Sequence, residues 1–254
     1  MKRSTRPSPM KAGYGIWKRH FANAQVVFLA GSVIRGEGTR SSDLDIVVIH
    51  KELPAAYRRS FTYEGWPVEA FVHDPQTLNY FFWEVDRRSG IPTLPSMVVE
   101  GKAIPEENKF SRSLKSLAQA VLNAGPPKWT EEDIARARYT ITNLCDDIRA
   151  PRNHAELAAS ASSLYDVLAD FYFRSGGRWS AKGKSVPRKL AEADPALARR
   201  FVKAFQTVFS THRSAPILKL AESILRPFGG PLFDDYQLKA PSRWRKPRQR
   251  HAAR

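Results

Sequence analysis

The sequence has one cysteine among its 254 residues and no apolar run of the roughly 20 residues that a membrane-spanning helix needs. A single thiol, Cys145, cannot form an intrachain disulfide, and we expect it to be a core residue of a cytoplasmic protein. The six histidines are scattered, so they offer no zinc-ligand spacing together with that cysteine. The basic N-terminus is not followed by an apolar segment, so we predict no signal peptide and no membrane partner.

Acidic residues are also few, with 25 against 41 lysines and arginines, which gives a formal net charge of +16. Four basic residues lie in residues 1–11 and seven in residues 239–254, and neither end contains an acidic residue. We therefore expect a basic N-terminal extension and a basic flexible tail, which would bind polyanions such as RNA without specificity. Between the ends, 30 basic residues face 25 acidic ones, an excess that a phosphate-binding cleft would explain.

The hydrophobic pattern divides the rest of the chain into two parts. Strand-like apolar runs alternate with helical ones up to about residue 105, whereas every long segment from Thr130 onward has helical spacing. We predict an α/β (α+β) head with a small mixed sheet at residues 12–122, followed by an all-α helical bundle at residues 130–238. The Gly- and Pro-containing residues 123–129 are the expected linker.

Within the head, apolar periodicity and turn residues predict each element. Helices are expected at residues 12–23, 75–88 and 112–122. Strands are expected at residues 25–30, 43–49, 59–63 and 68–73, and residues 97–104 are expected to add an edge strand or hairpin.

The most informative segment is GSVIRGEGTRSSDLD, residues 31–45, which lies between apolar runs at residues 26–30 and 46–49. This pattern predicts a strand, a turn and a second strand. Side chains two residues apart in a strand point the same way, so Asp43 and Asp45 present two carboxylates on one side. Beside a fully apolar run, such a pair is costly to place without a cation.

The first half of this motif offers a place for an anion. Gly31 allows close approach of the backbone, and Ser32 is expected to cap a short helix whose free N–H groups suit a phosphate. Mg²⁺ prefers one or two carboxylates together with substrate phosphates and waters. The motif therefore predicts a site for magnesium and a nucleoside triphosphate.

These residues, in this order, resemble the DNA polymerase beta-type nucleotidyltransferase superfamily. Residues 31–36 are similar to the GSxxRG pattern, and residues 42–45 to the SDxD pattern, of its small members, the minimal and aminoglycoside nucleotidyltransferases. That family has a third carboxylate on a later strand, and Glu69 fits it. Glu69 is flanked by apolar residues on its own strand, so it lies on the opposite face from them. Glu64 competes for the role but lies beside Gly65 in an expected hairpin turn.

The resemblance implies a two-metal transfer of a nucleoside monophosphate, AMP from ATP in the first place, to a hydroxyl group, with release of pyrophosphate. Asp43, Asp45 and Glu69 would hold two Mg²⁺ ions, with Mn²⁺ as an alternative, and Glu69 would bind the metal on the acceptor side or take the acceptor proton. The residues expected to contact the nucleotide are Gly31, Ser32, Arg35 and Ser42 in the head and Lys182 and Lys184 in the helical part.

The two lysines lie in the segment GGRWSAKGK, residues 176–184, which joins glycines to three cations between two expected helices. Similar basic segments face the cleft in the helical domains of related nucleotidyltransferases. The resemblance therefore implies that Lys182 or Lys184 contacts phosphates. Asp166 and Asp170, one helical turn apart, are either exposed or an alternative base for the acceptor.

The sequence leaves the acceptor open. The size and two-domain layout resemble the small resistance-type enzymes and favour a small hydroxylated molecule such as an aminoglycoside. The basic excess favours a nucleotide or RNA instead, and the hydroxyl of a protein side chain, as in antitoxin-like adenylylation, is a third alternative. A noncatalytic nucleotide-binding regulator is a fourth, against which the three carboxylates argue.

Overall fold

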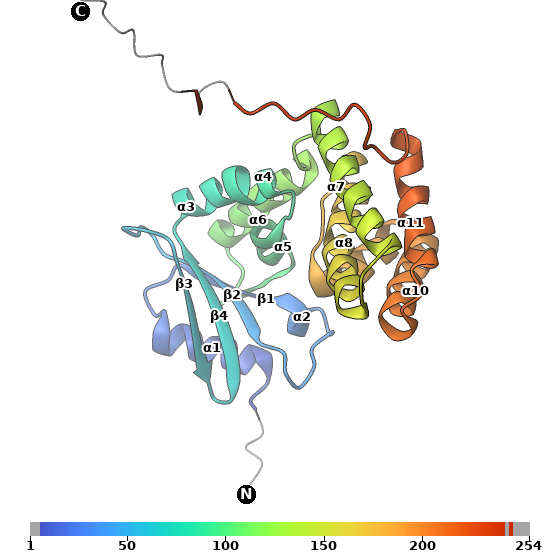
Figure 1. Cartoon of the computed structure of the whole chain (residues 1–254). Coiled ribbons are helices and arrows are strands. Elements are labelled where there is room, and N and C mark those ends of the chain that lie inside the picture. The colour runs from blue at the N-terminus through green and yellow to red at the C-terminus, as the bar shows by residue number, and fades with distance from the viewer. Residues whose placement is uncertain (1–5, 242–243, 246–254) are drawn as a thin grey trace, which may run out of the picture. The chain divides into compact units, whose positions relative to one another are not determined.

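The computed structural model describes residues 6–241 and 244–245. It divides into two compact units, of which the first comprises Met1–Lys128 and Gly176–Ser180 and the second Trp129–Ser175 and Ala181–Arg254. The first unit is an α/β structure and the second is helical, so the predicted fold class is confirmed (Figure 1). Most of the predicted basic extension and tail falls on residues 1–5, 242–243 and 246–254, which lie outside the described residues.

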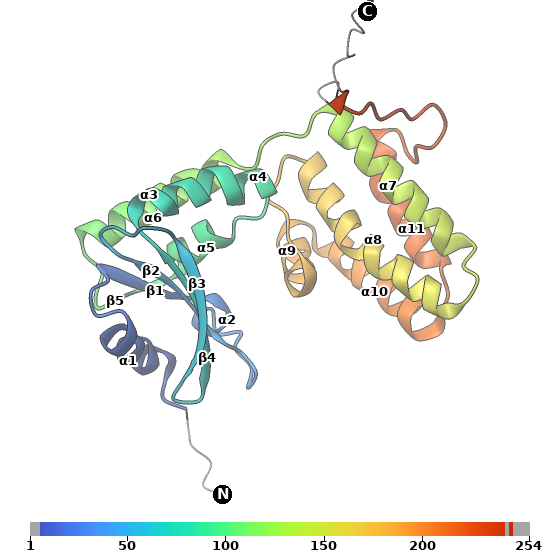
Figure 2. The same ribbon diagram turned by 60° about the vertical axis from the view of Figure 1, so that its left-hand side comes forward.

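The first unit contains a five-stranded mixed sheet in the order β3-β4-β2-β1-β5 (Figure 2). β2 and β4 pair in parallel, and the other neighbouring strands pair antiparallel. The strands are β1 (Val26–Ala30), β2 (Leu44–Ile49), β3 (Tyr57–Tyr63), β4 (Trp66–His73) and β5 (Lys102–Ile104).

Helices cover both faces of this sheet, which explains why β1 and residues 46–49 of β2 are apolar throughout. α1 (Pro9–His20) lies on one face, where its Ile16 packs in a core with Leu29 and Val48. The other face carries Phe28 and Val47, which pack against the helices that follow the sheet. Those elements are α3 (Pro75–Tyr80), the π-helical η1 (Phe81–Asp86), α4 (Arg87–Ser89), α5 (Thr93–Glu100) and α6 (Lys109–Ala124).

Most elements in this unit begin one to three residues away from the starts that the sequence predicts, including the strand expected at residues 43–49, which begins at Leu44. α1 begins at Pro9, three residues early, because Ser8 accepts a hydrogen bond from the Lys11 N–H at 3.4 Å and caps it. The strand predicted at residues 97–104 is wrong for its first half, which belongs to α5. A short apolar run has no clear period, so Val98 could be buried equally well from a helix or from a strand.

The second unit is a bundle with one buried core. Its first helix begins with a capping box, in which Thr130 and Asp133 bond each other's backbone N–H groups. Cys145 is 8% exposed in this core, and burial raises the pKa of its thiol to about 11. No helix within the described residues has the length and apolarity to cross a membrane. The helices are α7 (Glu131–Arg149), α8 (His154–Ser175), η2 (Gly183–Ser185), α9 (Val186–Ala193), α10 (Pro195–Thr211), α11 (Ala215–Leu225) and η3 (Arg226–Phe228).

The segment Gly176–Ser180 comes from between two helices of the bundle but folds with the α/β unit. The indole N–H of Trp179 donates to the Leu122 carbonyl at 2.9 Å, and its ring packs against the core on the η1 face of the sheet. The Ser180 N–H donates to the Gly90 carbonyl at 2.7 Å. This segment is therefore a structural part of the α/β unit.

Among the buried titratable side chains of the α/β unit, Asp86 and His73 have large pKa shifts. Burial raises the pKa of Asp86 to about 6, although the backbone N–H groups of Leu94 and Thr93 donate to its carboxylate. Burial lowers the pKa of His73 to about 4, and its Nδ1 has no hydrogen-bond partner among the described residues. In the folded state Asp86 therefore favours its neutral, protonated form, and His73 favours its neutral, unprotonated form.

The two groups are expected to make opposite contributions to the dependence of stability on pH. The contribution of Asp86 is fully present below about pH 4 and is lost as the pH rises through about 6, whereas that of His73 is present above about pH 6.5 and lost as the pH falls through about 4. As the pH rises from about 4 to about 6, the unfolding free energy of Asp86→Asn should increase by about 3 kcal/mol relative to wild type. As the pH rises from about 4 to about 6.5, that of His73→Gln should decrease by about as much relative to wild type. Urea unfolding across this range measures both slopes, and parallel profiles for the two variants would contradict the assignment.

Candidate active site

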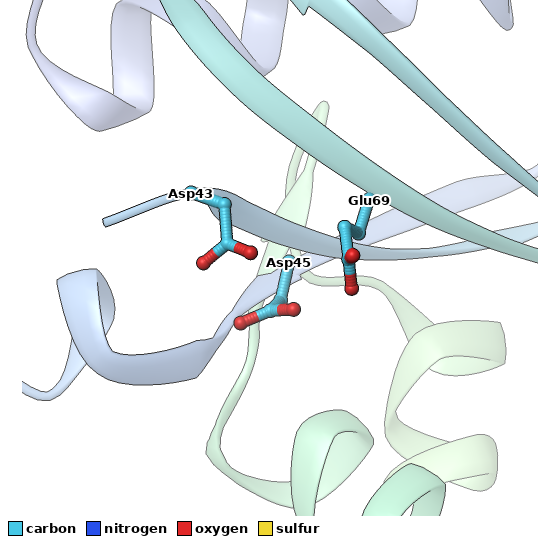
Figure 3. A group of neighbouring side chains, drawn as sticks. All are labelled: Asp43, Asp45 and Glu69. Atoms are coloured by element: carbon cyan, nitrogen blue, oxygen red, sulfur yellow. The ribbon is translucent and has the colours of Figure 1, made fainter. Parts of the chain in front are cut away.

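The structure brings the three predicted carboxylates together. Asp43 lies in the turn just before β2, Asp45 is the second residue of β2, and Glu69 is in β4. The parallel pairing of β2 with β4 places Asp45 beside Glu69. One oxygen from each of the three side chains lies within 4.8 Å of the others (Figure 3).

Strand alternation explains why the side chains converge. Leu44, between the two aspartates, is fully buried in the core on the α1 face, so Asp45 points to the opposite face. Val68 and Ala70 are buried in that same α1-face core and flank Glu69, which therefore also points to the opposite face. The triad of Asp43, Asp45 and Glu69 is half-buried, beside the start of β2 and the middle of β4, two strands whose remaining residues are mostly core.

This donor set fits a hard divalent cation. Three carboxylates at such distances repel one another unless positive charge lies between or beside them, and carboxylate oxygens are the ligands that Mg²⁺ prefers. Part of the compensation comes from Arg58 on β3, whose Nη2 donates to Glu69 Oε2. Glu64, the competing third carboxylate, is exposed at the β3–β4 turn with a φ of 43° and is not part of the group.

The glycine of the motif lies directly against the triad. Gly31 has a φ of +79°, a left-handed conformation that side chains disfavour, and a Cβ at this position would overlap Asp45 Oδ2. The pairing of β1 with β2 explains this contact, because it places the preceding residue, Ala30, opposite Asp45. A glycine is therefore required here by both the backbone and the neighbouring carboxylate.

Ser32 does not cap the short helix, so that prediction was wrong. α2 (Gly31–Ile34) begins one residue earlier, with Ala30 as its N-cap and no side-chain cap. The Ser32 hydroxyl instead donates to Ser42 Oγ at 3.5 Å, and Ser42 Oγ accepts the Thr39 N–H at 2.8 Å. The two serines thus connect the start of the motif to its end.

Arg35 is engaged in two ion pairs in this structure. Its guanidinium contacts Glu37 at 3.0 Å and Glu100 of α5 at 3.1 Å. Burial opposes its charge, but the two carboxylates outweigh that effect and raise the pKa of Arg35 further. These contacts connect the motif loop to α5, and a role for Arg35 toward phosphate stays a prediction.

Lys182 and Lys184 are exposed and belong to the helical unit, so their predicted contact with phosphate also stays a prediction. Lys182 lies in the lining of a cavity of about 540 Å³ within that unit, together with Asp166 and Asp170. Asp166 Oδ1 accepts the Gly183 N–H at 2.9 Å, which gives it a structural partner in the loop that carries the two lysines.

Comparison with known families identifies the first unit. The family model described as a nucleotidyltransferase domain matches residues 15–93, a range that contains the triad and the Gly31 turn. Residues 15–93 form a nucleotidyltransferase domain. For these residues the match confirms the family and the enzyme class expected from the sequence, a nucleotidyltransferase.

Among solved structures, the chain is similar to a nucleotidyltransferase-like protein from Exiguobacterium sibiricum 255-15. The identity is 13% and the TM-score 0.43, over 85% of this chain and 74% of that one. No curated protein matches the chain.

Proposed function

We propose that the protein transfers the monophosphate part of a nucleoside triphosphate, AMP from ATP in the first place, to a hydroxyl group of an acceptor. The observation that supports this reaction is the triad, whose carboxylate oxygens lie within 4.8 Å of one another inside the matched nucleotidyltransferase domain. The acceptor oxygen forms a bond to the α-phosphorus. The bond from that phosphorus to the bridging oxygen breaks, and pyrophosphate leaves.

Each side chain of the triad has a proposed role. Asp43, Asp45 and Glu69 would hold Mg²⁺, with Mn²⁺ as an alternative. The bound ions would neutralise phosphate charge and lower the pKa of the acceptor hydroxyl. The proton of that hydroxyl goes to solvent or to a carboxylate oxygen of Glu69, which lies at the outer side of the triad.

The N–H of Gly31 and the hydroxyls of Ser32 and Ser42 are proposed to bind the phosphates of the donor. They lie in one motif loop, and Gly31 contacts the carboxylate of Asp45, so a phosphate bound there would lie beside the metal ligands. Lys182 or Lys184 would add positive charge from the helical unit.

The expected acceptor is a small hydroxylated molecule. An aminoglycoside, the first candidate from the sequence, carries positive charge, and the Arg58 guanidinium beside Glu69 disfavours such a molecule at the acceptor side of the triad. RNA contact through the basic ends and a cytoplasmic location remain predictions.

Nucleotide binding in the presence of magnesium tests the part of the proposal that concerns the nucleotide donor. Thermal unfolding with ATP, GTP, CTP and UTP should show stabilisation of about 3 kcal/mol at a hundredfold excess over Kd for the preferred nucleotide, because the ligand binds only the folded state. Removing the metal with EDTA should abolish most of that shift. A chain that no nucleotide stabilises, and that releases no pyrophosphate, would contradict the proposal.

A further inference from the structure

The sheet order gives the triad two distinct sides. The Gly31 turn continues from β1, on one side of β2, whereas β4 and β3 lie on the other. In a phosphoryl transfer the attacking and leaving oxygens are roughly in line, on opposite sides of the phosphorus. If the leaving phosphates bind at the Gly31 turn, the acceptor approaches from the side of β4 and β3, where Glu69 lies.

Strand register determines which side chains line the acceptor side. Ser60 of β3 pairs with Glu69, and Arg58 pairs with Phe71, two residues further along β4. Side chains at alternate positions share a face, so Arg58 and Ser60 lie on the face of Glu69. Both are exposed on β3, which is an edge strand.

Arg58 supplies the positive charge beside Glu69 on the acceptor side. Its guanidinium lies over the Phe71 ring, 4.9 Å from the centroid, while Nη2 donates to Glu69 Oε2. The side chain is nevertheless 57% exposed. A guanidinium has five N–H donors in a planar fork, so after the contact with Glu69 it retains donors for a second anion.

We propose that Arg58 binds a phosphate group of the acceptor, and hence that the acceptor is a phosphorylated compound with a free hydroxyl. The inference rests on the proposed nucleotidyl transfer and specifies its substrate class. The fork geometry of arginine suits phosphate, and its fixed charge beside Glu69 repels cationic acceptors. A phosphate monoester of a small molecule and a phosphodiester near the 3′ end of RNA both supply this chemistry.

Binding to the full chain tests the proposal. The protein is first saturated with Mg²⁺ and α,β-methylene-ATP, which is not cleaved, and calorimetry then measures the affinity for ribose 5-phosphate against ribose and for a triribonucleotide against adenosine. We expect at least one phosphate-bearing ligand to bind about tenfold tighter than its reference, since a charge-assisted hydrogen bond is worth about that factor. The pair that shows the advantage identifies the source of the phosphate.

Arg58→Gln should remove this advantage, and Arg58→Lys should retain part of it. The matched control is Arg59→Gln, because Arg59 lies on the opposite face of the same strand and stacks on Phe61 at the same 4.9 Å. Turnover with labelled ATP should show the Arg58→Gln effect in the KM for the acceptor.

Equal affinity of wild type and Arg58→Gln for the phosphate-bearing ligands would overturn the proposal, as would tighter binding of a cationic aminoglycoside than of either of them. The titration of the protein with Mg²⁺ and α,β-methylene-ATP shows whether the ATP analogue itself binds. If it does not bind, the result contradicts the proposed function and not the role of Arg58.

Discussion

Replacing Asp45 by asparagine is expected to lower the rate of pyrophosphate release about a thousandfold while the protein remains folded. Asparagine has nearly the same shape but carries no negative charge, so the triad loses the ligand that pairs with Glu69 across the two strands. Metal-based stabilisation of the transition state is worth several kcal/mol, and about 1.4 kcal/mol corresponds to a factor of ten in rate. Pyrophosphate release under saturating ATP and Mg²⁺ measures the effect.

Thermal unfolding distinguishes a role of Asp45 in metal binding from a role in the stability of the fold. Because the carboxylate oxygens of the triad lie within 4.8 Å of one another, removing one charge should leave the metal-free melting temperature unchanged or higher, while the stabilisation by Mg²⁺ is reduced. Glu64→Gln, which removes an exposed carboxylate at the β3–β4 turn, outside the triad, should affect neither quantity. An Asp45→Asn protein with normal turnover would contradict the assignment of the triad.

The sequence predicts the triad because side chains two residues apart in a β-strand point to the same face. A strand predicted at residues 43–49 places Asp43 and Asp45 on one face, although the strand of the structure begins at Leu44, and the burial of Val68 and Ala70 turns Glu69 away from the α1-face core. The relation between the two segments is not local. It depends on the parallel pairing of β2 with β4, which no short-range pattern specifies.

The structure differs from the sequence prediction where two local conformations are close in free energy. Ser32 is a good N-cap residue, but it lies inside the helix, which begins at Gly31, and its hydroxyl bonds to Ser42 instead. Val98 lies in a run too short to show a period, so burial in the core decides for a helix. Trp179 folds with the α/β unit through tertiary packing that its neighbours in sequence do not indicate.

Arg58 was missed although the sequence contains a signal for it. The turn at Glu64 and Gly65 predicts a tight hairpin, and counting outward from such a turn pairs Ser60 with Glu69. Arg58 then follows on the same face, two residues away. The register of this hairpin therefore predicts a cation beside the third carboxylate.

Gly31→Ala is expected to reduce turnover about a hundredfold. The substitution forces a side chain into the left-handed region, at about 1–2 kcal/mol, and its Cβ would overlap Asp45 Oδ2, so the carboxylate or the turn must move. A displacement of about 1 Å of a group that positions the reaction can cost about a hundredfold in rate. Pyrophosphate release and the stabilisation by Mg²⁺ should therefore fall together.

Gly36→Ala provides the matched control within the same loop. Gly36 has nearly the same φ, +78°, but a Cβ there would meet no atom within 4 Å. The two variants share the backbone cost and differ in the contact with Asp45, so Gly31→Ala should lose far more activity than Gly36→Ala, and any further loss in its melting temperature reports the displaced contact. If Gly31→Ala retained the turnover of Gly36→Ala, the close approach of the turn to Asp45 would have no role in catalysis, and the donor phosphates would have to bind elsewhere.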